Sequence, residues 1–216
     1  MTVEHVLRVF VDAEGGHGNP LGVVMDTADW TDEQCQTRAA ELGYSETVFV
    51  DDAASGRIRI FTPSVRFPFA GHPTVGTAWL LHRLGFPVRG LETDAGLVEV
   101  LVDEDRATVW ALPQWAPPFD LIELESADAV DEASPSAGSA RYVWAWLDEP
   151  EGIVRARSFV PEAGIAEDEA TGAAAIRLAA QLGQSITILQ GVGSVLEAAP
   201  DGDRIRLRGR VADTDS

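Results

Sequence analysis

Apolar and polar residues alternate along many short segments of this chain, with the two-residue period that is typical of half-buried β-strands. Glycine, proline and clusters of polar residues separate these segments and mark turns. The pattern predicts strands over residues 6–11, 21–25, 44–50, 57–62, 96–102, 107–112, 142–146, 153–159, 185–190, 194–198 and 204–211. Thr31 and Gln34 form a capping box for a helix that Gly43 ends.

Two further helical segments are apolar on almost every side. The segment 74–84 carries no charge over its first eight residues, and Pro73 occupies its first turn. The segment 172–182 has Arg177 as its only charge. A helix without a polar face is expected to be buried. Several strands and one buried helix in each half predict curved, barrel-like sheets around a central helix, an α+β fold, rather than alternating strand–helix layers.

A short sequence repeat, Arg-x-Phe-x-Pro, occurs at residues 59–63 and again at residues 157–161. Each copy precedes one of the two apolar helices. A repeat of this kind indicates two similar units with a site between them. Residues 114–140, rich in proline, serine, alanine and acid, link the units. We therefore expect two pseudo-symmetric halves, residues 1–113 and 114–216. The last strand of the second half is expected to return to the first half.

Composition restricts the partners of the protein. The net charge is −19, from 16 basic and 35 acidic residues, which argues against nucleic acid or an anionic membrane surface as a partner. The sequence contains no apolar run of 18 residues, so no membrane span is predicted. The N-terminus lacks the basic start and apolar core of a signal peptide. A cytoplasmic location is the resulting expectation.

Two absences in the composition narrow the chemistry. The chain has no lysine, which excludes a lysine Schiff base and with it a pyridoxal phosphate aldimine. Cys35 is the only cysteine, which excludes an intrachain disulfide, a multi-cysteine zinc site and a two-thiol epimerase mechanism. Cys35 lies in a helical pattern, and we interpret it as a packing residue. The histidines show no metal-binding spacing, and no metal is expected.

A glycine lies close to the start of each apolar helix: Gly71 just before the first, and Gly172 as the first residue of the second. The first N–H groups of a buried helix lack acceptors inside the helix, and the helix dipole favours an anion there. Glycine lets a ligand approach the backbone closely. Glycine at these two positions is also compatible with tight turns that only pack a core. The occurrence of both motifs in one chain favours a shared anion site.

Three titratable residues could provide acid/base chemistry. Glu46 shares a predicted strand face with apolar residues, and burial there would raise its pKa. The same sequence pattern also fits a glutamate on an edge strand whose side chain points to water. His72 lies at the start of the first buried helix, but a lone histidine near a core is often structural. Asp168 could be only a helix N-cap. Together the three form an acid/base set spread over both halves.

Several of these motifs, taken together, resemble the PhzF-like (phenazine biosynthesis) proteins, which have the diaminopimelate epimerase fold. The resemblance is dense over residues 6–85 and again over 155–191. It rests on Gly18-Asn19-Pro20, Ser45-Glu46-Thr47-Val48-Phe49-Val50, Phe61-Thr62-Pro63 and the segments 68–76 and 167–172.

The resemblance implies a cofactor-free isomerase that acts on a small carboxylate, and a homodimer with the active site in a cleft between the halves. It implies that Glu46 moves a proton and that His72 and Asp168 assist. It also implies a group of substrate-binding residues whose backbone or side chains surround the carboxylate. These residues are Asn19, Gly71, Pro73, Thr171, Gly172 and Ala173.

The chain departs from the family pattern in its second half. Ala173 replaces the usual serine and Glu169 the common proline, and the half is short enough to leave the second barrel incomplete. These departures support an alternative, a weak or inactive member that binds a small anion or a protein partner. A proline or hydroxyproline racemase-like enzyme is a third candidate. It is disfavoured because Ala70 stands where the epimerase branch has a cysteine.

Overall fold

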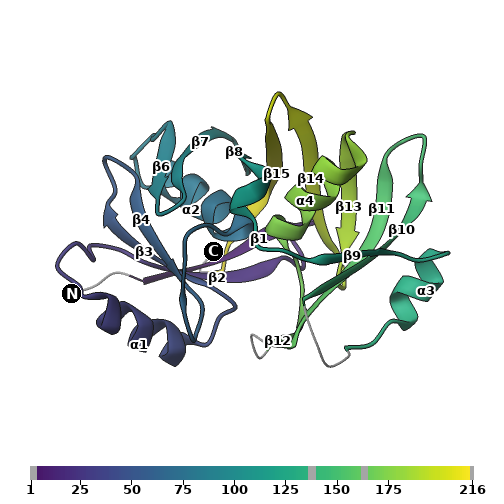
Figure 1. The fold of residues 1–216 in the computed structure, drawn as a ribbon. Helices are drawn as coiled ribbons and strands as arrows, with labels where there is room; N and C mark the ends of the chain where they lie inside the picture. The colour runs from purple at the N-terminus through teal and green to yellow at the C-terminus, as the bar shows by residue number, and fades with distance from the viewer. Residues whose placement is uncertain (1–3, 136–139, 162–164, 215–216) are drawn as a thin grey trace.

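The computed structural model describes residues 4–135, 140–161 and 165–214, and one continuous sheet runs through both halves of this part of the chain (Figure 1). The strands predicted from the alternating pattern all form. The first half contains β1 Glu4–Val11, β2 Asn19–Val24, β3 Thr47–Asp52, β4 Arg57–Phe61, β5 Arg66–Phe67, β6 Gly90–Thr93, β7 Gly96–Asp103 and β8 Arg106–Ala111.

The sheet of the first half closes into a barrel. Its strand order is β1-β2-β3-β4-β6-β7-β8, and β15 (Arg204–Asp213) pairs with both β8 and β1. The chain therefore returns from the second half to complete the first barrel. Helix α2 (Gly71–Arg83) lies inside, with every residue from Gly71 to Leu81 buried. The prediction of a sheet around a central apolar helix is confirmed here.

The sheet of the second half stays open. It wraps around helix α4 (Gly172–Leu182) in the order β15-β14-β13-β11-β10-β9, and among the described residues β9 pairs with β10 alone. An open sheet agrees with the expectation of an incomplete second barrel. The strands of this half are β9 Asp120–Glu123, β10 Arg141–Asp148, β11 Ile153–Val160, β12 Ile165–Asp168, β13 Ile186–Gln190 and β14 Ser194–Asp201.

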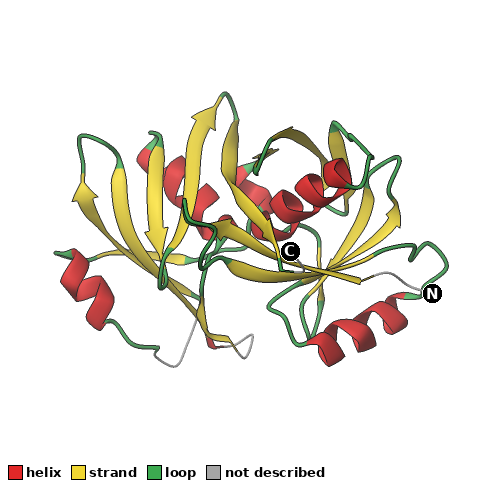
Figure 2. Cartoon of the chain, turned by 180° about the vertical axis from the view of Figure 1, so that it is seen from behind, coloured by secondary structure: helices red, strands yellow, loops and turns green. Residues whose placement is uncertain are grey.

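The two halves share a pattern of strand pairing. In the first, β4 pairs antiparallel with β3 and β5 and parallel with β6. In the second, β11 pairs antiparallel with β10 and β12 and parallel with β13. Helix α1 (Asp32–Leu42) connects the parallel strands β2 and β3, and α3 (Ala127–Glu132) connects the parallel strands β9 and β10. Both helices lie outside the sheets (Figure 2). The structure thus confirms the α+β fold with two pseudo-symmetric sheets.

The arginines of the repeat hold the outer helices in place. Arg59 donates to the Trp30 carbonyl and forms an ion pair with Asp32 at the start of α1. Arg157 donates to the carbonyls of Asp131 and Ala133 at the end of α3. Because both arginines point to the outer side of the sheet, this part of the repeat is structural. The chemistry has to come from the helix starts that follow each copy.

Details of several elements differ from the prediction. Strand β3 begins at Thr47 rather than residue 44, so Glu46 precedes the strand. The linker 114–140 contains β9 and α3, because its polar and proline-rich composition conceals short elements that tertiary contacts stabilise. The capping box of Thr31 and Gln34 is confirmed. Among the described residues, no helix combines the length and hydropathy needed to cross a membrane.

Candidate active site

The starts of the two central helices touch each other. A Cβ atom placed on Gly71 would lie 2.7 Å from the carbonyl carbon of Gly172, and one on Gly172 would lie 2.9 Å from the Cα of Gly71. Leu207 of β15 closes the contact from the other side, at 2.9 Å from either added Cβ. Real Cβ atoms do not approach backbone this closely, so both positions require glycine.

Neither helix start is closed by a capping side chain. The N-cap residues are Ala70 for α2 and Thr171 for α4, and neither makes a side-chain capping hydrogen bond. The geometry of a helix leaves its first N–H groups without intrahelical acceptors. Both sets of N–H groups lie at the same cavity, which Gly71, Gly172 and Ala173 help to line. Two helix dipoles therefore favour an anion at one place.

The cavity between the helix starts measures about 120 Å³ and has two kinds of wall. Phe67, Phe69 and Phe119 form part of an apolar wall. Glu46, His72 and Asp168, the three residues selected as an acid/base set, also line the cavity. The structure thus brings together all three residues, from the loop before β3, the first turn of α2 and the end of β12.

Glu46 lies at the cavity with its side chain 16% exposed. Its Oε2 atom is buried and accepts no hydrogen bond from the described residues. Burial raises the pKa of Glu46 to about 7, and the Ser45 hydroxyl lowers it slightly. The alternative of an edge-strand glutamate that points to water is wrong. A carboxyl group with this pKa exists in both protonation states near neutral pH.

His72 is 3% exposed, and its Nδ1 atom lies 3.5 Å from Oε2 of Glu46. Burial lowers the pKa of His72 to about 4, although the charge of Asp168 and the Pro20 carbonyl oppose the shift. The imidazole is therefore neutral at pH 7, and its contact with Glu46 is not a full ion pair. Its Nε2 atom has no hydrogen-bond partner among the described residues.

Asp168 accepts hydrogen bonds on both carboxylate oxygens. Asn19 donates to Oδ1 at 2.7 Å and the Thr171 hydroxyl to Oδ2 at 2.6 Å. Burial and the charge of Glu46 raise the pKa of Asp168 to about 6, opposed by His72 and by these two donors. The N-cap of α4 is Thr171, so Asp168 is not the N-cap, the simpler role that the sequence allowed.

Two of the expected substrate-binding residues do not line the cavity. Asn19 is buried behind it and contacts Asp168 and the Ala170 carbonyl. Pro73 is buried in the first turn of α2 and supplies no N–H group. The sequence did not identify the apolar wall contributed by Pro117, Pro118 and Phe119, because these residues come from the linker.

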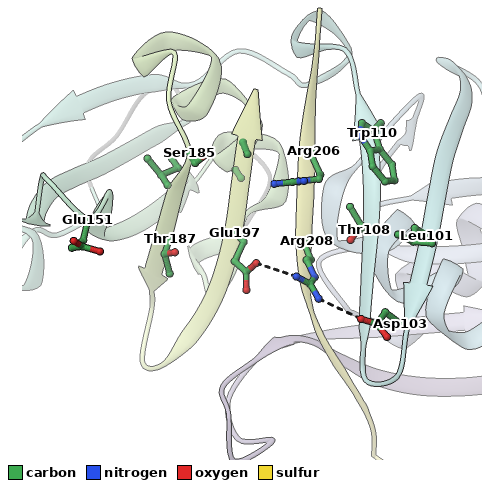
Figure 3. Close-up of a pocket in the computed structure, with 13 residues that line it drawn as sticks. Leu101, Asp103, Thr108, Trp110, Glu151, Ser185, Thr187, Glu197, Arg206 and Arg208 are labelled. Carbon is green, nitrogen blue, oxygen red and sulfur yellow. Dashed lines mark ion pairs between the residues drawn. The ribbon is translucent and has the colours of Figure 1, made fainter. Parts of the chain in front are cut away.

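A larger groove of about 380 Å³ lies on the outer face of the sheet, across β7, β8, β15, β14 and β13 (Figure 3). Three of its charged side chains pair with one another. Arg208 lies 3.7 Å from Asp103 and 3.8 Å from Glu197. The groove contains neither an open helix start nor a buried acid, so the inner cavity is the candidate site despite its smaller volume.

Fold and site together define a protein with a diaminopimelate epimerase-like fold and three buried titratable residues at two paired helix starts. The sequence profile of the PhzC-PhzF family, described as phenazine biosynthesis-like protein, matches residues 7–147. The trans-2,3-dihydro-3-hydroxyanthranilate isomerase of Pseudomonas aeruginosa is 32% identical, over 85% of this chain and 85% of that protein. The chain therefore belongs to the PhzF (phenazine biosynthesis-like) family.

Two further comparisons agree with this assignment. A protein of Pasteurella multocida, named as an uncharacterized isomerase, is 44% identical over 44% of this chain and 35% of its own length. A PhzF-family phenazine biosynthesis protein of Enterococcus faecalis has the same fold, with a TM-score of 0.79 at 22% identity. That match covers 99% of this chain and 97% of the other. The expectation of an isomerase is confirmed by the named isomerases among the relatives.

Proposed function

We propose that this protein is a cofactor-independent isomerase that transfers a proton within a small carboxylate-bearing metabolite in the cytoplasm. The observation that carries the proposal is the meeting of three buried titratable residues with two uncapped helix starts in one cavity. Residues whose pKa values are displaced by burial, in a concave site, are typical of acid/base catalysis.

The backbone would bind the substrate carboxylate. The N–H groups of Gly71 and His72 from α2, and of Gly172 and Ala173 from α4, are the free donors at the cavity. A proton removed from a carbon conjugated with the carboxylate leaves negative charge that spreads onto it. Backbone dipoles fixed at that position stabilise the charge as it develops, without reorganisation.

Glu46 would act first as the base and then as the acid. Its carboxylate form removes a proton from one carbon, and the resulting carboxylic acid returns that proton to a second carbon of the conjugated system. A pKa of about 7 suits both steps near neutral pH. His72, neutral and with an unpartnered Nε2, can hydrogen-bond to the substrate. Asp168, held by two donors, keeps His72 oriented electrostatically.

We further propose that the substrate is a ring carboxylate of the kind in the name of the Pseudomonas relative. The apolar wall of Phe67, Phe69 and Phe119 supports this choice, because a planar hydrocarbon body buries well against aromatic rings. The small cavity supports a compact molecule.

Deuterium incorporation tests this function. The protein is incubated in D₂O with trans-2,3-dihydro-3-hydroxyanthranilate, and isomerisation and solvent deuterium in the product are followed by NMR and mass spectrometry. Glu46→Gln keeps the shape of the side chain and removes the base, and the rate is expected to fall by about 10²–10⁴. Glu33→Gln, on the exposed first turn of α1, is the matched control. Exchange at the wild-type rate in Glu46→Gln would rule out the assigned role.

A second candidate function is the binding of a small anion with little or no turnover. Two observations favour it: Ala173 provides a methyl group where the family usually has a hydroxyl, and the cavity of about 120 Å³ is smaller than a typical ligand pocket. Ala173→Ser distinguishes the two functions. A rise in turnover indicates a weakened isomerase, whereas tighter binding of a simple carboxylate with no turnover in either form supports the anion binder.

The homodimer and the division into halves 1–113 and 114–216 stay predictions. Leu97 and Leu101 project outward from β7 and are 67% and 58% exposed, which supports an apolar contact on this face. Analytical ultracentrifugation measures the assembly. A monomer at tens of micromolar would contradict the dimer.

A further inference from the structure

Gln190, the last residue of β13, lies directly behind the candidate site. It is fully buried and contacts Asp168 at the end of β12 and Thr171 at the start of α4. Its Oε1 atom accepts from the Thr171 N–H at 3.1 Å and from the Tyr142 hydroxyl at 3.0 Å. Its Nε2 atom donates to the Asp168 carbonyl at 2.9 Å and to the Thr171 hydroxyl at 2.9 Å. Every hydrogen-bonding group of the amide therefore has a partner.

The backbone fixes the orientation of this amide. The Thr171 N–H can only donate, so the amide atom that faces it must be the oxygen. The Asp168 carbonyl can only accept, so the amide atom that faces it must be the nitrogen. A flipped amide would place its nitrogen against the Thr171 N–H and its oxygen against the Asp168 carbonyl, so both backbone hydrogen bonds would be lost. Gln190 thus has a single favourable orientation.

The fixed amide determines the direction of the Thr171 hydroxyl. The hydroxyl oxygen already accepts a hydrogen from Nε2 of Gln190, so its own hydrogen is free to point at Oδ2 of Asp168, 2.6 Å away. On the other side, Oε1 of Gln190 has no hydrogen, and the Tyr142 hydroxyl must therefore donate to it. The chain of donors runs in one direction, from Tyr142 and Gln190 through Thr171 to Asp168.

We propose that Gln190 is a positioning residue that, through the Thr171 hydroxyl, holds the carboxylate of Asp168 in its hydrogen-bond-accepting form. A carboxylate that receives a directed hydroxyl hydrogen is stabilised relative to the carboxylic acid. The catalytic consequence rests on the proposed function, but the effect on the ionisation of Asp168 does not.

The other groups that face Asp168 act on it from separate elements. Asn19 of β2 donates to its other oxygen. Glu46, from the loop before β3, raises its pKa, and His72 of α2 lowers it. Tyr142 of β10 is linked to Asp168 by hydrogen bonds through Gln190, and burial together with the charge of Asp168 in turn raises the pKa of Tyr142. Loss of the Thr171 donor leaves the raising effects of burial and Glu46 in place, so the pKa of Asp168 should rise further above about 6.

The test is a direct titration of Asp168 by ¹³C NMR. Protein labelled at aspartate side-chain carboxyls is titrated, and the Asp168 signal is assigned by its loss in Asp168→Asn. Thr171→Val is expected to raise the pKa of Asp168 by about one unit, and Gln190→Met by a smaller amount, whereas Thr171→Ser keeps the wild-type value. Gln36→Met, which removes another amide-to-carbonyl hydrogen bond on α1, is the matched control.

A comparison of single and double variants tests whether Gln190 affects Asp168 by way of Thr171. If Gln190 acts through Thr171, most of the shift caused by Gln190→Met disappears when Thr171 is already valine. An equal shift in both backgrounds, or an unchanged Asp168 titration in Thr171→Val, would overturn the inference. If Gln190→Met does not fold, the Thr171→Val and Thr171→Ser pair still decides whether the hydroxyl sets the pKa. The titration needs no substrate, so its result can be interpreted even if the isomerase assay fails.

Discussion

Gly71 and Gly172 come so close that neither has room for a Cβ atom, and this contact joins the starts of the two central helices. The obstacle on each side is backbone and the buried Leu207, so a larger residue cannot be accommodated by turning a flexible side chain. The contact therefore explains why glycine begins both helices. It also places two sets of free N–H groups at one cavity.

Gly172→Ala is expected to separate the two helix starts. The added methyl group must displace Gly71 or Leu207, at a cost of about 1–3 kcal/mol in the free energy of unfolding. Carboxylate binding should weaken at the same time, because the two sets of donors would no longer converge. Urea denaturation and calorimetric titration with a small carboxylate measure the two effects.

Gly16→Ala is the matched control for this change. The atoms nearest to a Cβ on Gly16 belong to the carboxyl group of Asp12, at 3.0–3.5 Å, and this side chain can move. If Gly172→Ala binds the carboxylate as tightly as Gly16→Ala does, convergence of the helix starts is not what holds the anion.

Glu46→Gln should stabilise the protein while it lowers the activity. Burial raises the pKa of Glu46 from 4.5 to about 7. Below pH 4.5, Glu46 is protonated in both the folded and the unfolded state, and the wild type is then at its most stable relative to the variant. As the pH rises from 4.5 to about 7, only the unfolded state ionises freely, and the wild type loses stability. Above pH 7 the variant should be more stable by about 1–3 kcal/mol.

Thermal or urea denaturation of both proteins at pH 4.5 and pH 8 measures this difference. The pKa of His72 is lowered to about 4, so its own effect is a loss of stability as the pH falls from 6.5 through 4. That loss occurs in both proteins and largely cancels in the comparison. A variant with equal or lower stability at pH 8 would show that Glu46 is not destabilised by burial.

Asp168→Asn should move the acidic limb of the pH–rate profile to lower pH. Glu46 raises the pKa of Asp168, and because the interaction is mutual, the ionised Asp168 also disfavours ionisation of Glu46. Removing this charge lets Glu46 ionise at a lower pH, by about 0.5–1 unit. The measurement is the pH dependence of kcat/KM, with Asp131→Asn on α3 as a control. If the acidic limb of the pH–rate profile stays at the same pH in Asp168→Asn, the two carboxyl groups do not interact.

Much of the fold could be predicted from the sequence because its signals are local. Alternation of polar and apolar residues located the strands, and the lack of a polar face located the two buried helices. Glu46, His72 and Asp168 were selected on their surroundings in sequence, and the structure places all three at one cavity. The alternative simple roles of Glu46 and Asp168 were excluded only by the burial and hydrogen bonds that the fold creates.

Features that depend on contacts between distant segments could not be predicted. Strand β9 and helix α3 are short and polar in sequence, and they form because β10 and β11 support them. Gln190 acts on Asp168 from 22 positions away, and no spacing in the sequence links the two. The wall of Pro117 and Phe119 likewise lies in a segment whose composition indicates only a linker.

Arg177 should control the fit of the substrate rather than the chemistry. It is the only charged residue of α4, and its guanidinium donates from Nε and Nη2 to the Ala116 carbonyl at 3.0 and 2.7 Å. Ala116 immediately precedes the Pro117–Phe119 segment that forms one wall of the cavity. Arg177→Leu removes both hydrogen bonds and leaves the buried carbonyl without these donors, so the wall should loosen.

The expected result for Arg177→Leu is a KM about tenfold higher with kcat nearly unchanged, because a charged donor of this kind is worth roughly 1.5–3 kcal/mol and the acid/base residues stay in place. Arg177→Lys should recover part of the affinity, since an ammonium group can still donate to the carbonyl. Arg89→Leu, at an exposed position, controls for the loss of positive charge. A fall in kcat with constant KM would instead show that Arg177 supports the acid/base residues, and that the Pro117–Phe119 wall does not select the substrate.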